Sequence, residues 1–240
     1  MNPVDREYAP PSRWKADGVL MTGLGLPDGT PTHMTTGEPV SIFGNTPLVV
    51  SGGVLTNSPV DDQPPIHMAG YAQAALSEAH VGEVWASVIA TDQCNTSLAL
   101  VIPTVAWAHR YYPAAEVHAV FEPCSGRWHV APYDDRSGEG PTWIRGRGPR
   151  WNDGHEHLVG VRCRQDGTLE VMLPDASSCI TAPGAIATDR IGEFGIVEIY
   201  RRRNRGSVSL GITAWGLSPM APAGQGPATS VPSSDAREDS

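Results

Sequence analysis

Aromatic residues interleaved with arginines form the main candidate binding set in this sequence. They fall in predicted loops and strand ends, where Trp107, Tyr111, Tyr112, Trp143 and Trp151 alternate with Arg110, Arg145, Arg147 and Arg150. Sugar rings stack on aromatic faces while polar neighbours hold the hydroxyl groups. We therefore predict a glycan groove lined by Trp107, Tyr111, Tyr112, Trp143, Arg145 and Trp151. Tryptophans at strand ends also close sandwiches or enter subunit contacts, so a protein interface is the alternative.

Glu193 and Glu198 are the nearest candidates for hydrolytic chemistry. Glycosidases that retain configuration hold two carboxyl groups ~5 Å apart, one as nucleophile and one as acid. A separation of five residues places these two side chains on opposite faces of a regular strand, because side chains alternate with period two. We therefore predict that the chain is not an enzyme.

Metal and redox motifs are missing from the sequence. His155 and His157 share a strand face, but no His-Glu-x-x-His motif occurs. The four cysteines, Cys94, Cys124, Cys163 and Cys179, contain no Cys-x-x-Cys pair. We expect buried free thiols and no cofactor, with a Cys163–Cys179 bridge across neighbouring strands as the alternative.

Short runs of alternating apolar residues between turn clusters predict a body made of strands. Gly52-Gly53 and Asp166-Gly167 predict hairpin turns, because tight turns need positive φ angles. The one helix-like piece is 71–80, which is rich in alanine. Since a single helix cannot cover these strands, two antiparallel sheets must cover each other. The predicted strands are 48–55 (a hairpin), 83–91, 97–103, 116–121, 126–132, 157–163, 168–174, 193–202 and 207–215.

Three stretches resemble the concanavalin A-like sandwich in its laminin-G-like form. They are DGVLMTGLGLPDGT (17–30), GHEHLVGVRCRQDGTLEVMLPDAS (154–177) and GEFGIVEIYRRRN (192–204). Their order is also similar to modules of minor tail proteins in phages of actinobacteria. The resemblance implies an all-β, two-sheet antiparallel jelly-roll sandwich. Calcium-binding members carry carboxylate loops, for which Asp61-Asp62 and Asp134-Asp135 are the only candidates here.

Charge and composition limit the classes of partner that the chain can bind. A net charge of −9 argues against binding to a phosphate backbone, which needs clustered positive charge. No stretch reaches the ~20 apolar residues of a membrane helix, and the N-terminus lacks the apolar core of a secretion signal. We predict an arm at 1–17, a sandwich at 18–217, and a Pro/Ala/Ser-rich disordered tail at 218–240.

The resemblance and the arms together predict a non-enzymatic structural component of a phage tail that contacts the host surface. It would be made in the host cytoplasm and reside in the virion tail as a homo-oligomer, joined to other tail proteins through residues 1–17 and 218–240. We expect no nucleic acid and no membrane insertion. A module that binds bacterial cell-wall glycan is the alternative function, and a glycoside hydrolase is the second alternative.

Overall fold

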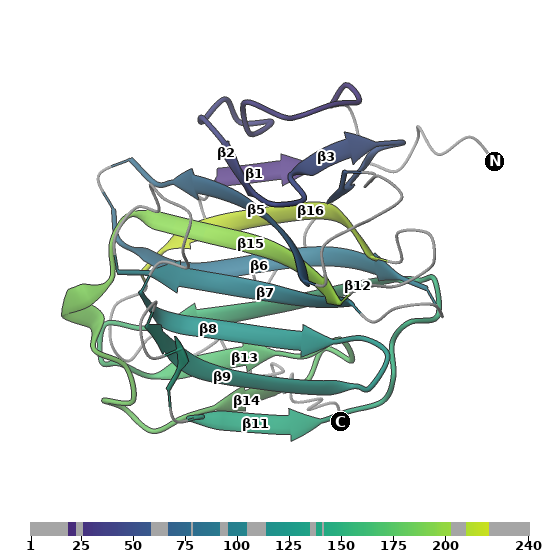
Figure 1. Cartoon of the computed structure of the whole chain (residues 1–240). Helices are drawn as coiled ribbons and strands as arrows, with labels where there is room; N and C mark the ends of the chain where they lie inside the picture. Colours follow the sequence, from purple (N-terminus) through teal and green to yellow (C-terminus); the bar gives the residue numbers. More distant parts are fainter. Residues whose placement is uncertain are drawn as a thin grey trace, which may run out of the picture.

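Two antiparallel β-sheets packed face to face make up the body of the protein (Figure 1). A computed structural model describes residues 19–22, 26–58, 67–77, 79–91, 96–104, 114–134, 138–140, 142–202 and 210–220. Residues 1–18, 59–66, 105–113 and 221–240 are the longer stretches outside it. Among the described residues, no helix has the length and apolar character needed to cross a membrane.

The first sheet, here called the β6 sheet, has the strand order β14-β13-β12-β6-β16-β4-β3, and β1 also pairs with β16. Its strands are β1 (Val19–Thr22), β3 (Leu48–Ser51), β4 (Val54–Asn57), β6 (Val81–Ala90), β12 (Glu156–Cys163), β13 (Leu169–Met172), β14 (Ser178–Ile180) and β16 (Leu210–Pro219).

The second sheet, here called the β8 sheet, has the order β10-β9-β8-β7-β15-β5-β2, and β11 also pairs with β9. Its strands are β2 (Ser41–Gly44), β5 (His67–Ala75), β7 (Thr96–Pro103), β8 (Ala115–Glu122), β9 (Arg127–Asp134), β10 (Gly138–Glu139), β11 (Ile144–Arg147) and β15 (Phe194–Arg202). A short 3-10 helix, η3, spans Thr188–Arg190.

Alternation along each strand builds the core between the sheets. In β6, Val84, Ala86 and Val88 enter the main core, whereas Trp85 packs in a small cluster on the other face. In β15, Val197 and Ile199 face the core and Ile196 faces outward. The period-two pattern read from the sequence is therefore the pattern that buries the sandwich.

Both predicted glycine hairpins are confirmed. Gly52 and Gly53 have φ angles of 58° and 82° and join β3 to β4. Gly167 has a φ of 76°, and its N–H donates to the carbonyl of Arg164 in the turn between β12 and β13. Asp166, which was also expected to have a positive φ, does not have one, and its side chain accepts the N–H of Thr168 at 2.9 Å. This turn therefore needs one left-handed residue.

The helix predicted at 71–80 is wrong, because β5 runs through Ala75 as a strand. β5 pairs with β15 along its whole length and with β2 on the other side. Ala72 and Ala74 enter the core, while Tyr71 faces outward. Pairing on two edges therefore overrides the helix propensity of alanine, which is a weak preference.

The expected free thiols are confirmed for Cys163 and Cys179, and the alternative, a bridge between these two residues, is wrong. Cys163 lies on β12 and Cys179 on β14, with β13 between them. Two strand spacings amount to ~9.6 Å, which is beyond the reach of a disulfide. The expectation of free thiols fails for Cys124, which is disulfide-bonded. Cys94 lies outside the described residues.

β16 continues to Pro219, and Met220 packs against the main core. Residues 218–220, the first part of the predicted tail, thus belong to the sandwich. The predicted arm at 1–17 and the rest of the tail lie outside the described residues.

Candidate functional site

A cavity of about 260 Å³ opens at one end of the sandwich, between the two sheets. On the β8 sheet it is bounded by the end of β8 and the start of β9. On the β6 sheet it is bounded by the start of β12 and by the segment after β13. Its apolar walls come from Phe121, Trp128, Pro149, Trp151, Leu173 and Pro174. Its polar lining comes from Arg127, Arg150, Asp153, His157 and Asp175.

Strand alternation places the aromatic wall. Phe121 and Trp128 are directly opposite each other on β8 and β9, and both face the core. Trp128 lies against Gly146 of β11, where a Cβ atom would come within 2.6 Å of the indole. Trp151 is 4% exposed, and its backbone N–H donates to the carbonyl of Pro123 at 3.2 Å. The indoles are therefore held in place by the fold.

His157 joins this wall from the opposite sheet. It shares a face of β12 with Val159 and Val161, both in the core, so its ring points toward the gap between the sheets. The ring meets Trp151 edge to face, with centroids 5.6 Å apart. The Nε2 atom of His157 lies 2.9 Å from Oδ1 of Asp153.

The two carboxylates in the lining also cap turns. Asp153 accepts the N–H of His155 at 3.0 Å, and its hydrogen bond with His157 is the main reason that its pKa is lowered. Asp175 accepts hydrogen bonds from Oγ and from the N–H of Ser177, and these lower its pKa. Both groups are therefore ionised acceptors at neutral pH.

The structure separates the residues predicted to line a groove. Trp151 lines the cavity, whereas Trp143 is half-buried against the core and Arg145 is exposed on β11, opposite His129. Trp107, Tyr111 and Tyr112 lie outside the described residues. The sequence analysis overlooked Phe121, Trp128 and the two aspartates. For Asp153, the sequence Asp153-Gly154 just before a strand could have indicated a turn whose aspartate is held in place. Aspartates in such turns often accept a hydrogen bond from the backbone N–H two residues further along the chain.

A second polar cluster lies on the outward face of the β8 sheet. His118 of β8 sits between two carboxylates, with Nδ1 3.7 Å from Glu139 and Nε2 3.9 Å from Glu198. These are distances of ion pairs rather than hydrogen bonds. His129 of β9 makes a closer contact, with Nε2 2.6 Å from Oε1 of Glu139. Glu198 is 1% exposed.

The pKa values of His118 and Glu139 are shifted by the charges of their neighbours. Burial by itself would lower the pKa of His118, but Glu139 and Glu198 outweigh it and raise the value to about 8. The neighbouring histidines lower the pKa of Glu139 to about 2. Glu193 stands apart, because it precedes β15 by one residue and the nearly extended chain between them places it ~16 Å from Glu198. The pair considered for hydrolysis thus does not converge.

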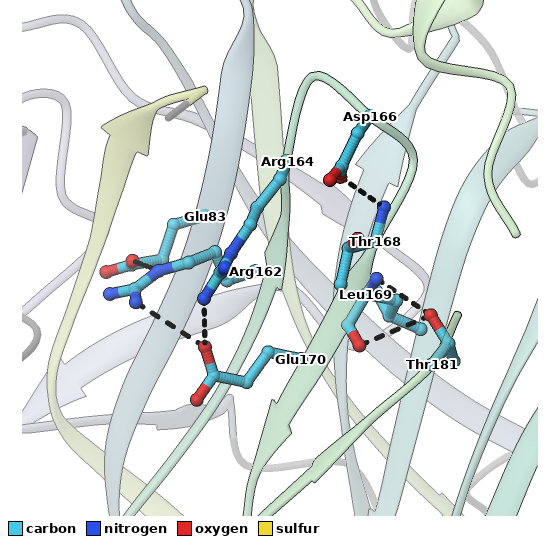
Figure 2. A network of polar contacts seen from close by, with 8 residues as sticks. All are labelled: Glu83, Arg162, Arg164, Asp166, Thr168, Leu169, Glu170 and Thr181. Atoms are coloured by element: carbon cyan, nitrogen blue, oxygen red, sulfur yellow. Dashed lines mark hydrogen bonds and ion pairs between the residues drawn. The ribbon is translucent and has the colours of Figure 1, made fainter. Parts of the chain in front are cut away.

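Figure 2 shows a third cluster, an ion-pair network on the outward face of the β6 sheet. Nε of Arg162 on β12 lies 2.7 Å from Glu83 on β6, and its Nη1 lies 3.5 Å from Glu170 on β13. Arg164 also reaches Glu170 at 3.5 Å. Burial raises the pKa of Glu83 to about 7, although Arg162 opposes the shift. The two arginines and two glutamates pair with one another, although Nε of Arg164 has no hydrogen-bond partner among the described residues, and this mutual pairing indicates a structural role.

Within the described ranges, no group of three or more His, Cys, Asp or Glu side chains could hold a metal ion. Asp61 and Asp62 lie outside those ranges, as does Asp135 and the side chain of Asp134. The described residues therefore do not fit a calcium site.

Solved structures of low sequence identity share this architecture. The Emp46p carbohydrate recognition domain in its potassium-bound form has a TM-score of 0.56 at 8% identity, over 76% of this chain and 89% of that one. The Emp47p carbohydrate recognition domain has a TM-score of 0.53 at 9% identity, over 85% of this chain and 98% of that one. The VIP36 exoplasmic/lumenal domain in its Ca²⁺/Man₃GlcNAc-bound form has a TM-score of 0.50 at 12% identity, over 84% of this chain and 88% of that one.

The chain has the concanavalin A-like fold. The predicted all-β, two-sheet antiparallel sandwich is thus confirmed. No protein-family model and no curated protein sequence matches the chain. The likeness therefore concerns the fold of this concanavalin A-like sandwich, and the resemblance to phage tail proteins stays a prediction.

Proposed function

We propose that this chain is a carbohydrate-binding domain and that the cavity beside Trp128 and Trp151 is its sugar site. The observation that carries the proposal is the lining itself, with indole and proline surfaces on the walls and ionised carboxylates with guanidinium groups at the rim. The shared fold supports it, since the similar structures include domains named for carbohydrate recognition.

The lining matches the two kinds of surface that a sugar offers. The C–H face of a pyranose ring packs on aromatic and proline surfaces, while its hydroxyl groups donate to carboxylates and accept from guanidinium groups. The cavity volume, about 260 Å³, is just below the range of small-molecule pockets, which begins at ~300 Å³. We therefore propose that it holds one sugar ring, with the rest of the glycan outside.

Binding without hydrolysis is part of the proposal. A glycosidase needs one carboxyl group whose raised pKa keeps it protonated as the acid. In the cavity, the pKa values of Asp153 and Asp175 are both lowered. Neither group is suited to donate a proton to a leaving group.

Titration with bacterial cell-wall oligosaccharides, followed by tryptophan fluorescence and calorimetry, tests the sugar site. Asp153→Asn keeps a turn-capping side chain but replaces the charged acceptor, so we expect weaker binding of the same glycan. Asp166→Asn is the matched control, because Asp166 also caps a turn and lies outside the cavity lining. Equal affinity in both variants, or no binding of any glycan, would overturn the proposal.

The biological setting is a separate proposal. We propose that the domain belongs to a phage tail as a homo-oligomer, with residues 1–17 and 218–240 joining neighbouring proteins, and that glycan binding is its contact with the host surface. Mass spectrometry of purified virions and light scattering of the isolated chain test these points. A monomer that is missing from virions would contradict them.

A further inference from the structure

The arginines whose side chains the structure describes divide into two groups. Arg162, Arg164 and Arg190 each pair with a carboxylate. No described carboxylate forms an ion pair with any member of the second group, here called the arginine patch: Arg127, Arg145, Arg147 and Arg150. The chain has 26 acidic side chains against 17 lysines and arginines. A shortage of carboxylates therefore does not explain the unpaired group.

Strand register gathers three members of the arginine patch on one surface, and Arg150 follows β11 three residues after Arg147. Arg127 of β9 and Arg147 of β11 are directly opposite each other, and Arg145 is opposite His129. Trp128 and Val130, which alternate with these positions on β9, enter the core, so the arginines face outward. All four patch arginines are exposed.

The backbone holds the patch together despite its charge. Like charges directly opposite on neighbouring strands destabilise a sheet. Here the N–H of Gly148 donates to the carbonyl of Gly126, and Nε of Arg147 donates to the carbonyl of Ser125 at 3.0 Å. Gly126 has a φ of 68°, and a Cβ there would lie 2.3 Å from the carbonyl oxygen of Gly148. The fold thus fixes Arg127 beside Arg147 without a neutralising partner.

The arginine patch is continuous with the cavity, because Arg127 and Arg150 line both. Nearby carboxylates are engaged elsewhere. Asp153 and Asp175 cap their own turns, and Glu122, opposite Arg127, accepts a hydrogen bond from Ser125 at 2.6 Å. Arg127 and Arg150, which line the cavity, therefore form no ion pair with these carboxylates. Arg145 and Arg147 lie on the outer surface beside Arg127, where the part of a ligand that extends out of the cavity would meet them.

We infer that the glycan bound at this cavity is acidic and that its carboxylate, sulfate or phosphate groups bind the arginine patch. The inference rests on the proposed sugar site and adds the charge of the ligand. Guanidinium groups suit such oxyanions because their paired N–H donors match two oxygens. The net charge of −9 would repel any polyanion that extends far beyond the patch, nucleic acid included, so the inference concerns an acidic glycan segment short enough to lie on the patch and in the cavity.

Comparing charged ligands with a neutral one of equal length distinguishes recognition of charge from recognition of the sugar. The probes are oligogalacturonate, its carboxyl-reduced neutral counterpart of equal length, poly(glycerol phosphate) and single-stranded DNA. We expect at least tenfold tighter binding of oligogalacturonate or poly(glycerol phosphate) than of the neutral counterpart, and weakening as salt rises. The preferred probe tells whether carboxylate or phosphate is the favoured group.

Variants of the patch test the residues. We expect the triple variant R127Q/R147Q/R150Q to lose that tenfold preference and, because repulsion is removed, to melt at a slightly higher temperature. A merely structural role would lower the melting temperature. R190Q is the control, because it removes one charge from an arginine that pairs with Glu116 and does not line the cavity. A triple Lys variant, which keeps the charge, should retain part of the preference.

The outcomes are distinct. Binding of the neutral counterpart as tight as that of oligogalacturonate, unchanged in R127Q/R147Q/R150Q, would overturn this inference and leave the sugar site standing. Binding of no glycan would overturn both. DNA bound as tightly as the acidic glycans would reveal a general polyanion surface and overturn the assignment to a glycan.

Discussion

Nε2 of His118 lies 3.9 Å from Oε2 of Glu198, and both side chains are buried on the outward face of the β8 sheet. The carboxylates of Glu198 and Glu139 raise the pKa of His118 to about 8 against the effect of burial. The folded protein therefore binds the proton of His118 more tightly than the unfolded chain does. This difference links the cluster to the pH dependence of stability.

Because the pKa of His118 rises from 6.5 to about 8 on folding, its contribution to stability is complete below pH 6.5 and is lost as the pH rises through 8. We expect the melting temperature to fall over this range, and His118→Gln to remove that part of the fall. Circular dichroism between pH 5 and 9 measures both. Parallel profiles of the two proteins would contradict the assignment.

Glu139 acts at the other end of the scale. Folding lowers its pKa from 4.5 to about 2, so its contribution is present above pH 4.5 and is lost as the pH falls toward 2. We expect Glu139→Gln to be less sensitive to acid over that range, as measured by urea unfolding at several pH values. An acid-unfolding curve identical to that of the parent chain would refute this.

Glu83 should behave in the opposite way to Glu139. Burial raises its pKa to about 7, so its favourable contribution is complete below pH 4.5 and is lost as the pH rises through 7. Glu83→Gln mimics the protonated side chain, and Arg162 keeps Glu170 as a partner. We expect the stability of the variant relative to the parent to rise across this range. A constant difference would mean that Arg162 keeps Glu83 ionised throughout.

Gly146→Ala should damage the sugar site through Trp128. The added Cβ would lie 2.6 Å from the indole, so the ring must move, at a cost of ~1–3 kcal/mol in stability. We expect weaker glycan binding and altered tryptophan fluorescence. Gly192→Ala is the matched control, because its Cβ meets only one atom, at 3.7 Å. Unchanged affinity in Gly146→Ala would argue against the aromatic wall.

Thiol reactivity should distinguish the cysteines. Cys163 is buried, and burial raises its pKa to about 12, whereas Cys179 is half-buried and free. In the native protein without reductant, we expect Cys179 to react with a thiol reagent and Cys163 to react after unfolding. Cys179→Ser should remove the native reaction. Rapid native labelling of Cys163 would contradict the packing of β12.

The sequence by itself determined the layered architecture. Alternation at Val84, Ala86 and Val88 leaves one apolar face per strand, and burial of such a face requires a second sheet. The turns were equally readable, because Gly52, Gly53 and Gly167 occupy positive φ angles that other residues adopt at a cost. These are local properties, fixed within a few residues.

Only the tertiary structure decided which residues meet. Strand partners turned the alanine-rich 71–80 into β5 over its first part, and the position of β13 kept Cys163 and Cys179 apart. The cavity joins Phe121 and Trp128 of one sheet to His157 and Asp175 of the other, and no sequence spacing encodes that contact. Long-range register sets these distances, whereas the pattern along a strand sets only the face on which each side chain lies.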